Sequence, residues 1–171
     1  MTIHSTHPFV DDDPDPARRF RGRVGGVVTL WTTGEGDARA GLTVTSLMVA
    51  LGPEPCVLAL IDPDSDFLDV VQRTGRAVVQ PLAWRDRALA EYFAGTAPAP
   101  GGPFRQADFV DTDHGPRLAS TTTWAAGRLV GERDMGWSAE IQLAIDDLAI
   151  GADDGEGLGH RRGRFERLAR A

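Results

Sequence analysis

Three hydroxyl side chains fall within four consecutive positions of the chain, at Thr43, Thr45 and Ser46 around Val44. In an extended strand, successive side chains point to opposite faces, so Thr43 and Thr45 share one face while Val44 and Ser46 share the other. Hydroxyls and backbone amides at this density can bind a polar ligand. Threonine is also favoured in strands by propensity alone, so the residues themselves leave a binding role and a structural role open.

A second polar segment, residues 62–65 (Asp-Pro-Asp-Ser), is rich in the residues that begin helices. The first turn of a helix offers unpaired amides and the positive end of the helix dipole to an anion. Ser65 suits contact with a phosphate, whereas Asp62 and Asp64 repel one unless they point away. Helix capping alone explains the same residues equally well.

All positive side chains of this sequence are arginines, because the chain has no lysine. Arg39 stands just before the hydroxyl-bearing segment, where it can neutralise a phosphate or serve as an ordinary surface residue. Arg161, Arg162 and Arg164 lie close together near the C-terminus. They suit the 2′-phosphate of a nucleotide, and a solvated basic edge is the alternative.

Strand signals dominate the chain from Gly26 onward. The predicted strands cover residues 27–33, 42–51, 56–61, 76–82, 121–130, 138–145 and 164–168. The strand at 56–61 is almost continuously apolar, which predicts burial on both faces. The strand at 138–145 alternates apolar and polar residues, which predicts one buried and one wet face. Two helices are expected, one between Ser65 and Gly75 and one at 84–94.

Strands that do not alternate regularly with helices favour an all-β fold, a closed antiparallel β-barrel with short helices. We expect one domain over residues 18–171, preceded by a flexible tail at 1–17. The tail holds His4 and His7, but no other ligand cluster accompanies them, so no metal site is predicted.

The composition excludes several classes of protein. A net charge of −7 argues against nucleic-acid binding, which needs a basic face. The longest apolar runs are strand-sized, which argues against a membrane span. The N-terminus lacks the pattern of a secretory signal, and a lone cysteine, Cys56, suits a reducing compartment, so the expected location is the cytoplasm.

Several segments resemble, in the same order, those of the flavin reductase-like family of FMN-binding split barrels, a Greek-key antiparallel fold. They cover roughly residues 20–168 and none is specific alone. The matching segments are 26–33 (Gly-Val-Val-Thr-Leu-Trp-Thr-Thr), 40–47 (Ala-Gly-Leu-Thr-Val-Thr-Ser-Leu), 51–55 (Leu-Gly-Pro-Glu-Pro), 75–79 (Gly-Arg-Ala-Val-Val), 89–95 (Leu-Ala-Glu-Tyr-Phe-Ala-Gly) and 162–165 (Arg-Gly-Arg-Phe).

The resemblance implies a homodimer that binds FMN, or FAD, in a cleft between barrel and partner, with NAD(P)H as co-substrate. In many members reduced flavin passes to a monooxygenase. By resemblance, residues 43–46 line the flavin ring and ribityl chain, Ser65 meets the phosphate, and Gln80 stands where relatives carry an asparagine that can contact the flavin edge. The implied cofactor-binding residues are Thr43, Val44, Thr45, Ser46, Ser65, Gln80 and Arg39.

One segment departs from the family pattern. Catalytic relatives carry Gly-Asp-His after the fifth strand, whereas this chain has Arg133–Asp134–Met135 there. Asp134 matches the aspartate and Met135 replaces the histidine. Hydride transfer depends on geometry and electrostatics rather than on an acid–base group, so the change weakens NAD(P)H use without excluding it. Asp134 and His160 are the candidate catalytic residues.

Three functions follow from these observations. The first is a flavin reductase that transfers hydride from NAD(P)H to flavin. The second is an FMN-binding carrier or sensor of the same fold without efficient reductase activity, which the altered Gly-Asp-His segment favours. The third keeps the barrel but exchanges the ligand, because related split barrels bind haem, pyridoxal phosphate or a deazaflavin.

Overall fold

The computed structural model describes residues 15–152 and 156–168. Most of the predicted tail, including His4 and His7, therefore lies outside the described residues. Helix α1 (Pro16–Val24) was not predicted and begins inside the segment expected to be tail. The Asp15 carboxylate caps it by accepting a hydrogen bond of 2.8 Å from the Ala17 amide. None of the described helices is long and apolar enough to cross a membrane.

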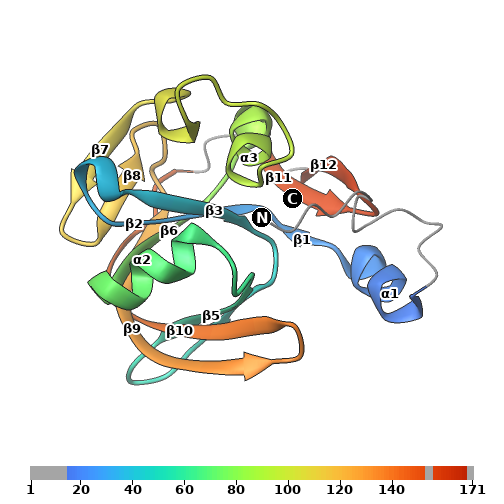
Figure 1. Ribbon diagram of the computed structural model, residues 1–171, viewed down its shortest axis with the longest axis horizontal. Helices are drawn as coiled ribbons and strands as arrows, with labels where there is room; N and C mark the ends of the chain where they lie inside the picture. Colours follow the sequence, from blue (N-terminus) through green and yellow to red (C-terminus); the bar gives the residue numbers. More distant parts are fainter. Residues whose placement is uncertain (1–14, 153–155, 169–171) are drawn as a thin grey trace.

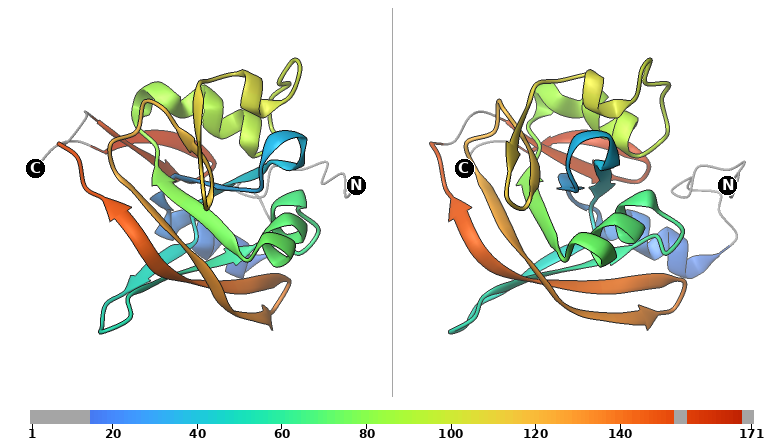
Figure 2. Two further views of the ribbon diagram at one scale, coloured as in Figure 1. Left: turned by 90° about the vertical axis from the view of Figure 1, so that its left-hand side faces the viewer. Right: turned by 60° about the vertical axis from the view of Figure 1, so that its left-hand side comes forward.

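The main sheet has seven antiparallel strands in the order β3-β2-β6-β9-β10-β5-β4 and curls strongly, as Figure 2 shows. Its strands are β2 (Thr29–Thr33), β3 (Ala40–Val44), β4 (Leu47–Ala50), β5 (Cys56–Ile61), β6 (Arg76–Pro81), β9 (Trp124–Met135) and β10 (Ser138–Ala149). The predicted all-β class and antiparallel split barrel are confirmed.

The barrel is closed by the chain itself rather than by a complete ring of paired strands. The predicted strand at 42–51 is two strands, because the chain bends at Thr45 and Ser46. β3 pairs with β2 and β4 pairs with β5, so the two edges of the sheet belong to one stretch of chain. The expected full closure by hydrogen bonding was wrong for this reason.

Two hydrophobic cores lie on opposite sides of the wall formed by β3, β2 and β6. The first fills the barrel and includes the fully buried Trp31, whose ring meets that of Phe67 edge-on at 6.2 Å. Phe67 comes from α2 (Asp66–Thr74), which Ser65 caps and which ends at Gly75, a residue with φ of 67°. This helix was predicted.

The second core lies between that wall and the elements drawn above it in Figure 1. It is covered by α3 (Arg87–Phe93), which follows the short 3₁₀ turn η2 (Trp84–Asp86); together they confirm the predicted helix at 84–94. Further cover comes from η3 (Pro103–Arg105), β7 (Phe109–Thr112), β8 (Gly115–Leu118) and a small sheet of β1 (Gly26–Val27), β11 (Gly157–Arg161) and β12 (Arg164–Leu168). Of these, β12 was predicted, whereas β7, β8 and β11 were not. The remaining 3₁₀ turn, η1 (Gly36–Ala38), joins β2 to β3.

The prediction that β5 is buried on both faces was wrong. Val57, Ala59 and Ile61 point into the barrel and are buried, whereas Leu60 is 42% exposed. The apolar sequence of β5 therefore alternates in burial. Its inner face packs in the barrel core, whereas Leu60 on its outer face is not fully covered by any described element. Of the alternation predicted for β10, the buried face is confirmed at Ala139, Ile141 and Leu143, but the predicted wet face was wrong at Glu140, which is 8% exposed.

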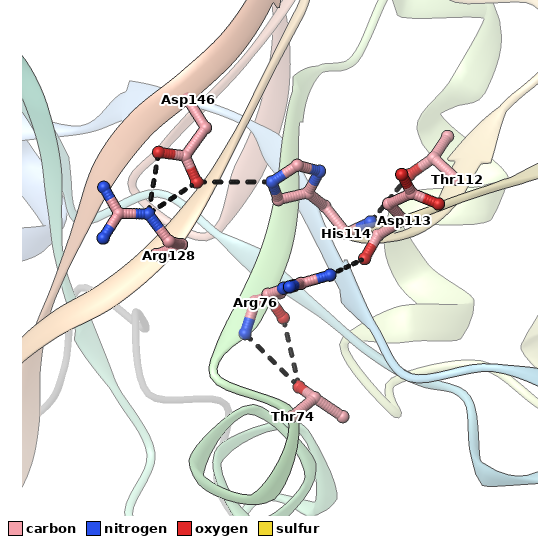
Figure 3. Close-up of polar contacts among 7 residues, drawn as sticks. All are labelled: Thr74, Arg76, Thr112, Asp113, His114, Arg128 and Asp146. Atoms are coloured by element: carbon pink, nitrogen blue, oxygen red, sulfur yellow. Dashed lines mark hydrogen bonds and ion pairs between the residues drawn. The ribbon is translucent and has the colours of Figure 1, made fainter.

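The β7–β8 hairpin is tied to the open end of the barrel by a polar cluster, drawn in Figure 3. The His114 Nε2 atom at the hairpin turn lies 3.4 Å from an Asp146 carboxylate oxygen on β10. Arg128 on β9 donates from Nε to the same carboxylate at 2.9 Å. Arg76 donates to the Asp113 carbonyl at 3.3 Å. Partial burial works against ionisation of Asp146, but the hydrogen bonds from Arg128 and His114 outweigh it and lower its pKa.

We predict that Asp146→Asn lowers the free energy of unfolding at neutral pH by about 0.2–1 kcal/mol, as expected for a partly exposed ion pair. A lowered pKa stabilises the fold above the ordinary carboxyl value of 3.8, and this stabilisation is lost as the pH falls through the folded-state pKa. The difference from wild type should therefore shrink below that value in urea titrations. Asp147→Asn is the control, because Asp147 makes no side-chain hydrogen bond with the described residues. A difference that grows with acid would contradict the assignment.

Candidate functional site

The bend at Thr45 and Ser46 is the point where segments far apart in the sequence meet. Ser46 joins β5, because the Leu60 amide donates to the Ser46 carbonyl at 3.4 Å and the Ser46 hydroxyl donates to the Leu60 carbonyl at 2.7 Å. On the other side, Gly26 lies so close to the Thr45 carbonyl oxygen that a side chain on Gly26 would collide with it. Gly26 in turn pairs with His160 on β11. The bend thus links β5, β1 and β11.

The three hydroxyls predicted to bind a ligand differ in what they do. The Thr43 hydroxyl donates to the Ala90 carbonyl in α3 at 2.7 Å, and the Ser46 hydroxyl donates to the Leu60 carbonyl. Val44 is buried in the barrel core. The half-buried Thr45 is the residue whose hydroxyl makes no hydrogen bond with any of the described residues. Among these three hydroxyls, Thr45 is therefore the one whose proton is not already donated to a described residue, while Thr43 and Ser46 keep their acceptor capacity.

The turn at residues 62–65 lies two residues beyond Leu60 and so stands beside Ser46. Its polar groups are already paired in the manner of a helix cap: the Ser65 hydroxyl donates to the Asp62 carbonyl at 2.7 Å and accepts from the Leu68 amide at 3.3 Å. The Asp64 amide donates to the Asp62 carboxylate. Asp62, Asp64 and Asp66 are exposed at this helix start. The local charge is negative, which opposes a phosphate.

Two other predicted site residues lie away from the bend. Gln80 is 0% exposed; its Oε1 accepts from the Leu118 amide at 2.8 Å and its Nε2 donates to the Thr32 hydroxyl at 3.3 Å. It joins the barrel wall to β8. Arg39 precedes β3 at its far end, roughly 20 Å along the chain from Thr45. Its guanidinium lies over the Phe104 ring at 4.8 Å.

The two candidate catalytic residues stand on different sides of the bend. His160 lies one strand away from it, through Gly26, and its ring meets that of Phe165 at 5.4 Å. Asp134 is exposed near the tip of the β9–β10 hairpin and is in register with Ala139, which pairs with Ile61. The structure therefore brings Thr45, Ser46, the 62–65 turn and His160 to the bend. Asp134 lies farther away on β9, separated from Ile61 of β5 by strand β10.

Sequence reasoning missed a charged group on the outer face of the barrel. Glu140 on β10 is almost fully buried, and Arg133 on β9 donates to its two carboxylate oxygens at 3.0 and 2.8 Å. Gln142 adds a third hydrogen bond at 3.1 Å. The hydrogen bonds from Arg133 and then Gln142 hold the pKa of Glu140 below its ordinary value. Glu140 occupies a polar position in the alternating sequence of β10, which predicted that its side chain would be exposed. Its ion pair with Arg133 depends on the register between β9 and β10, which the sequence does not give.

A cavity of about 200 Å³ opens elsewhere, beside the start of η2 and the loop before β9. Arg85, Asp86 and Glu156 contribute charges of both signs to its lining, together with Thr121 and Thr123. None of the predicted site residues lines it. The bend, rather than this cavity, is the place where the predicted residues meet.

Comparison with known proteins identifies the family. The sequence model of the flavin reductase like domain matches residues 21–169, so the chain belongs to the flavin reductase-like domain family. A curated relative, the reductase component of 4-hydroxyphenylacetate 3-monooxygenase from Pseudomonas aeruginosa, is 24% identical over 153 residues, which cover 88% of this chain and 89% of the relative.

Solved structures show the same fold. The flavin reductase PheA2 is 22% identical and superposes with a TM-score of 0.81, covering 92% of this chain and 99% of that chain. The NADH:FAD oxidoreductase SgcE6 of Streptomyces globisporus gives the same identity and TM-score over 94% and 96% of the two chains. SgcE6 has also been solved in complex with NAD and FAD fragments.

We predict that Gln80→Leu destabilises the fold by about 1–3 kcal/mol, because it leaves the buried Leu118 amide without its acceptor. Urea denaturation followed by circular dichroism measures the loss. Gln72→Leu is the matched control, since Gln72 is exposed and a surface substitution costs within about 0.5 kcal/mol. Equal losses in the two variants would assign Gln80 no special structural role.

Proposed function

We propose that this protein is a flavin reductase that binds FMN at the Thr45–Ser46 bend and transfers hydride from NAD(P)H to it. The observation that carries the proposal is the Thr45 hydroxyl, which makes no hydrogen bond with the described residues and lies at the bend between the edge strands β3 and β4, in a chain of the flavin reductase-like family. The neighbouring hydroxyls, of Thr43 and Ser46, already donate within the protein. A bound flavin supplies the redox chemistry.

The residues at the bend suit the polar edge and ribityl chain of a flavin. Thr45 offers a hydroxyl that can donate or accept. Ser46 and Val44 are held in place by β5 and by the barrel core, so the backbone between them is fixed. Gly26 lets a second strand approach this backbone closely. Such preorganised polar groups orient a ring for hydride transfer without an acid–base residue.

We propose that the protein works as a homodimer through the outer face of β4, β5, β9 and β10. Met48, which is 69% exposed, Leu60 and Met135 lie on this face, and the Arg133–Glu140 pair is in register with Leu60 between them. Exposed apolar side chains gathered around an internally paired ion pair on one sheet face favour association. Ser46 adjoins it through Leu60, so a second copy on this face would complete the walls of a cleft at the bend.

A flavin-dependent monooxygenase is the partner we propose for the reduced flavin, with both proteins in the cytoplasm. Support comes from the relative that is named as the reductase component of a monooxygenase.

The alternative is an FMN-binding carrier or sensor without efficient reductase activity. It is favoured by Met135, which replaces the family's histidine at the end of β9. Anaerobic addition of NADH or NADPH to the flavin-loaded protein separates the two. Bleaching of the flavin absorbance on a catalytic timescale supports the reductase, whereas bound but unreduced flavin supports the carrier.

We predict that Thr45→Val weakens FMN binding by about 0.5–1.5 kcal/mol, roughly 2- to 10-fold in Kd, because it removes a hydroxyl available to the ligand. Fluorescence titration measures the change. The matched control is Thr43→Val, which removes the hydrogen bond to Ala90 and should lower the melting temperature with little effect on Kd. The reverse pattern would refute the placement of the site at Thr45.

A further inference from the structure

Seven of the 18 arginines gather at one end of an acidic protein with a net charge of −7. We call this surface the arginine face; it is formed by helix α1 and the β11–β12 hairpin, which Figure 1 shows on the same side of the molecule. Its members are Arg18, Arg19, Arg21 and Arg23 on the helix, and Arg161, Arg162 and Arg164 on the hairpin. Arg167 does not belong to it, because it points to the other side of β12 and lies over the Trp84 ring at 4.8 Å.

Backbone contacts hold these two segments together although about 140 residues separate them. The Arg162 amide donates to the Gly22 carbonyl at 2.8 Å, and the Arg161 Nε donates to the Arg23 carbonyl at 3.1 Å. The hairpin turns at Arg162, which has φ of 54°, and this turn sets Arg161 and Arg164 opposite each other. The arginine face is thus part of the fold and is built from fixed backbone.

Negative charge on this face is scarce. Glu166 is the one acidic residue within residues 16–24 and 157–168. Asp15 lies 3.8 Å from Arg18 while it caps the helix, and Glu156 pairs with Arg167 at 2.9 Å. Burial, and to a lesser degree the neighbouring Arg18, lower the pKa of Arg21. A surface of this kind attracts anions.

The arginine face adjoins the bend. Gly25 and Gly26 connect α1 to β1; Gly25 packs against Arg161, and Gly26 touches both the Thr45 carbonyl and, by strand pairing, His160. Neighbouring strands lie about 5 Å apart, so a nucleotide can extend from the bend onto the arginines. The exposed Asp62, Asp64 and Asp66 follow β5, the strand that Ser46 contacts through Leu60, whereas Gly26 meets the Thr45 carbonyl. Charge therefore steers a phosphate toward the hairpin and away from α2.

We propose that the arginine face binds the phosphate groups of a dinucleotide whose ring lies at the Thr45–Ser46 bend. The proposal rests on the proposed function for the position of the ring. Guanidinium groups match phosphate oxygens through paired hydrogen bonds, which explains why arginines on two elements serve one ligand. The phosphates come from FAD or from NAD(P)H, and binding measurements distinguish these sources.

The test uses the full chain and the double variant Arg161→Gln/Arg164→Gln. Equilibrium dialysis measures Kd for riboflavin, FMN, FAD, NADH and NADPH at low and high salt. Arg73→Gln/Arg105→Gln is the control, because it removes the same charge from exposed positions on α2 and η3. Circular dichroism checks that both variants keep the wild-type melting temperature.

We expect the hairpin variant to raise the Kd of at least one dinucleotide about tenfold or more, to reduce its salt dependence, and to leave riboflavin unchanged. A loss for FAD alone assigns the face to the flavin pyrophosphate. A loss for NADPH larger than for NADH assigns it to the 2′-phosphate. Unchanged dinucleotide binding, or an equal loss in the control variant, overturns the proposal.

Failure of the proposed function gives a different result. If wild-type protein binds neither riboflavin nor FMN, the flavin site at the bend is refuted. The NADPH measurements still test the arginine face in that case, because they need no flavin. If flavins bind to wild type and respond to Thr45→Val but the arginines have no effect, the proposed function survives and the arginine face is a solvated edge.

Discussion

The structure depends on one constraint: residues 40–50 must supply both edges of a single curled sheet. The first half of this segment completes the ladder with β2, and the second half completes the ladder with β5. One residue cannot satisfy both ladders when the neighbouring strands diverge, so the chain bends at Thr45 and Ser46. The bend lets one stretch of chain form both edge strands, β3 and β4, and it leaves polar groups that the ladders do not use.

Charge is divided sharply around this bend. The start of α2 carries exposed aspartates, while α1 and the β11–β12 hairpin carry most of the local arginines. The net charge of −7 conceals this separation, because it averages two surfaces of opposite sign. An anionic ligand responds to the local field and not to the average, and for this reason we propose that its phosphates lie on the arginine side of the bend.

Buried polar side chains elsewhere in the fold hydrogen-bond to other strands of the protein, although the same residue types could also bind a ligand. Gln80 uses both ends of its amide inside the protein, and Glu140 is held by Arg133 on the barrel's outer face. Each group is satisfied by a partner on another strand, which is the condition for burying it at low cost. Their residue types alone would suit a ligand site equally well.

The sequence by itself determined the elements whose signals are local. The strands at Cys56–Ile61 and Arg164–Leu168 and the helix from Ser65 to Gly75 follow from apolar runs, caps and a left-handed terminal glycine, all read within a few residues. The ordered segments also determined the family resemblance. Only the tertiary structure decided which polar residues are available to a ligand. The partner of Thr43 is 47 residues away in α3, the partner of Gln80 is 38 residues away, and α1 meets a hairpin at the other end of the chain. Such distant neighbours determine whether a polar side chain hydrogen-bonds within the protein or remains available to a ligand, and they cannot be identified from the local sequence.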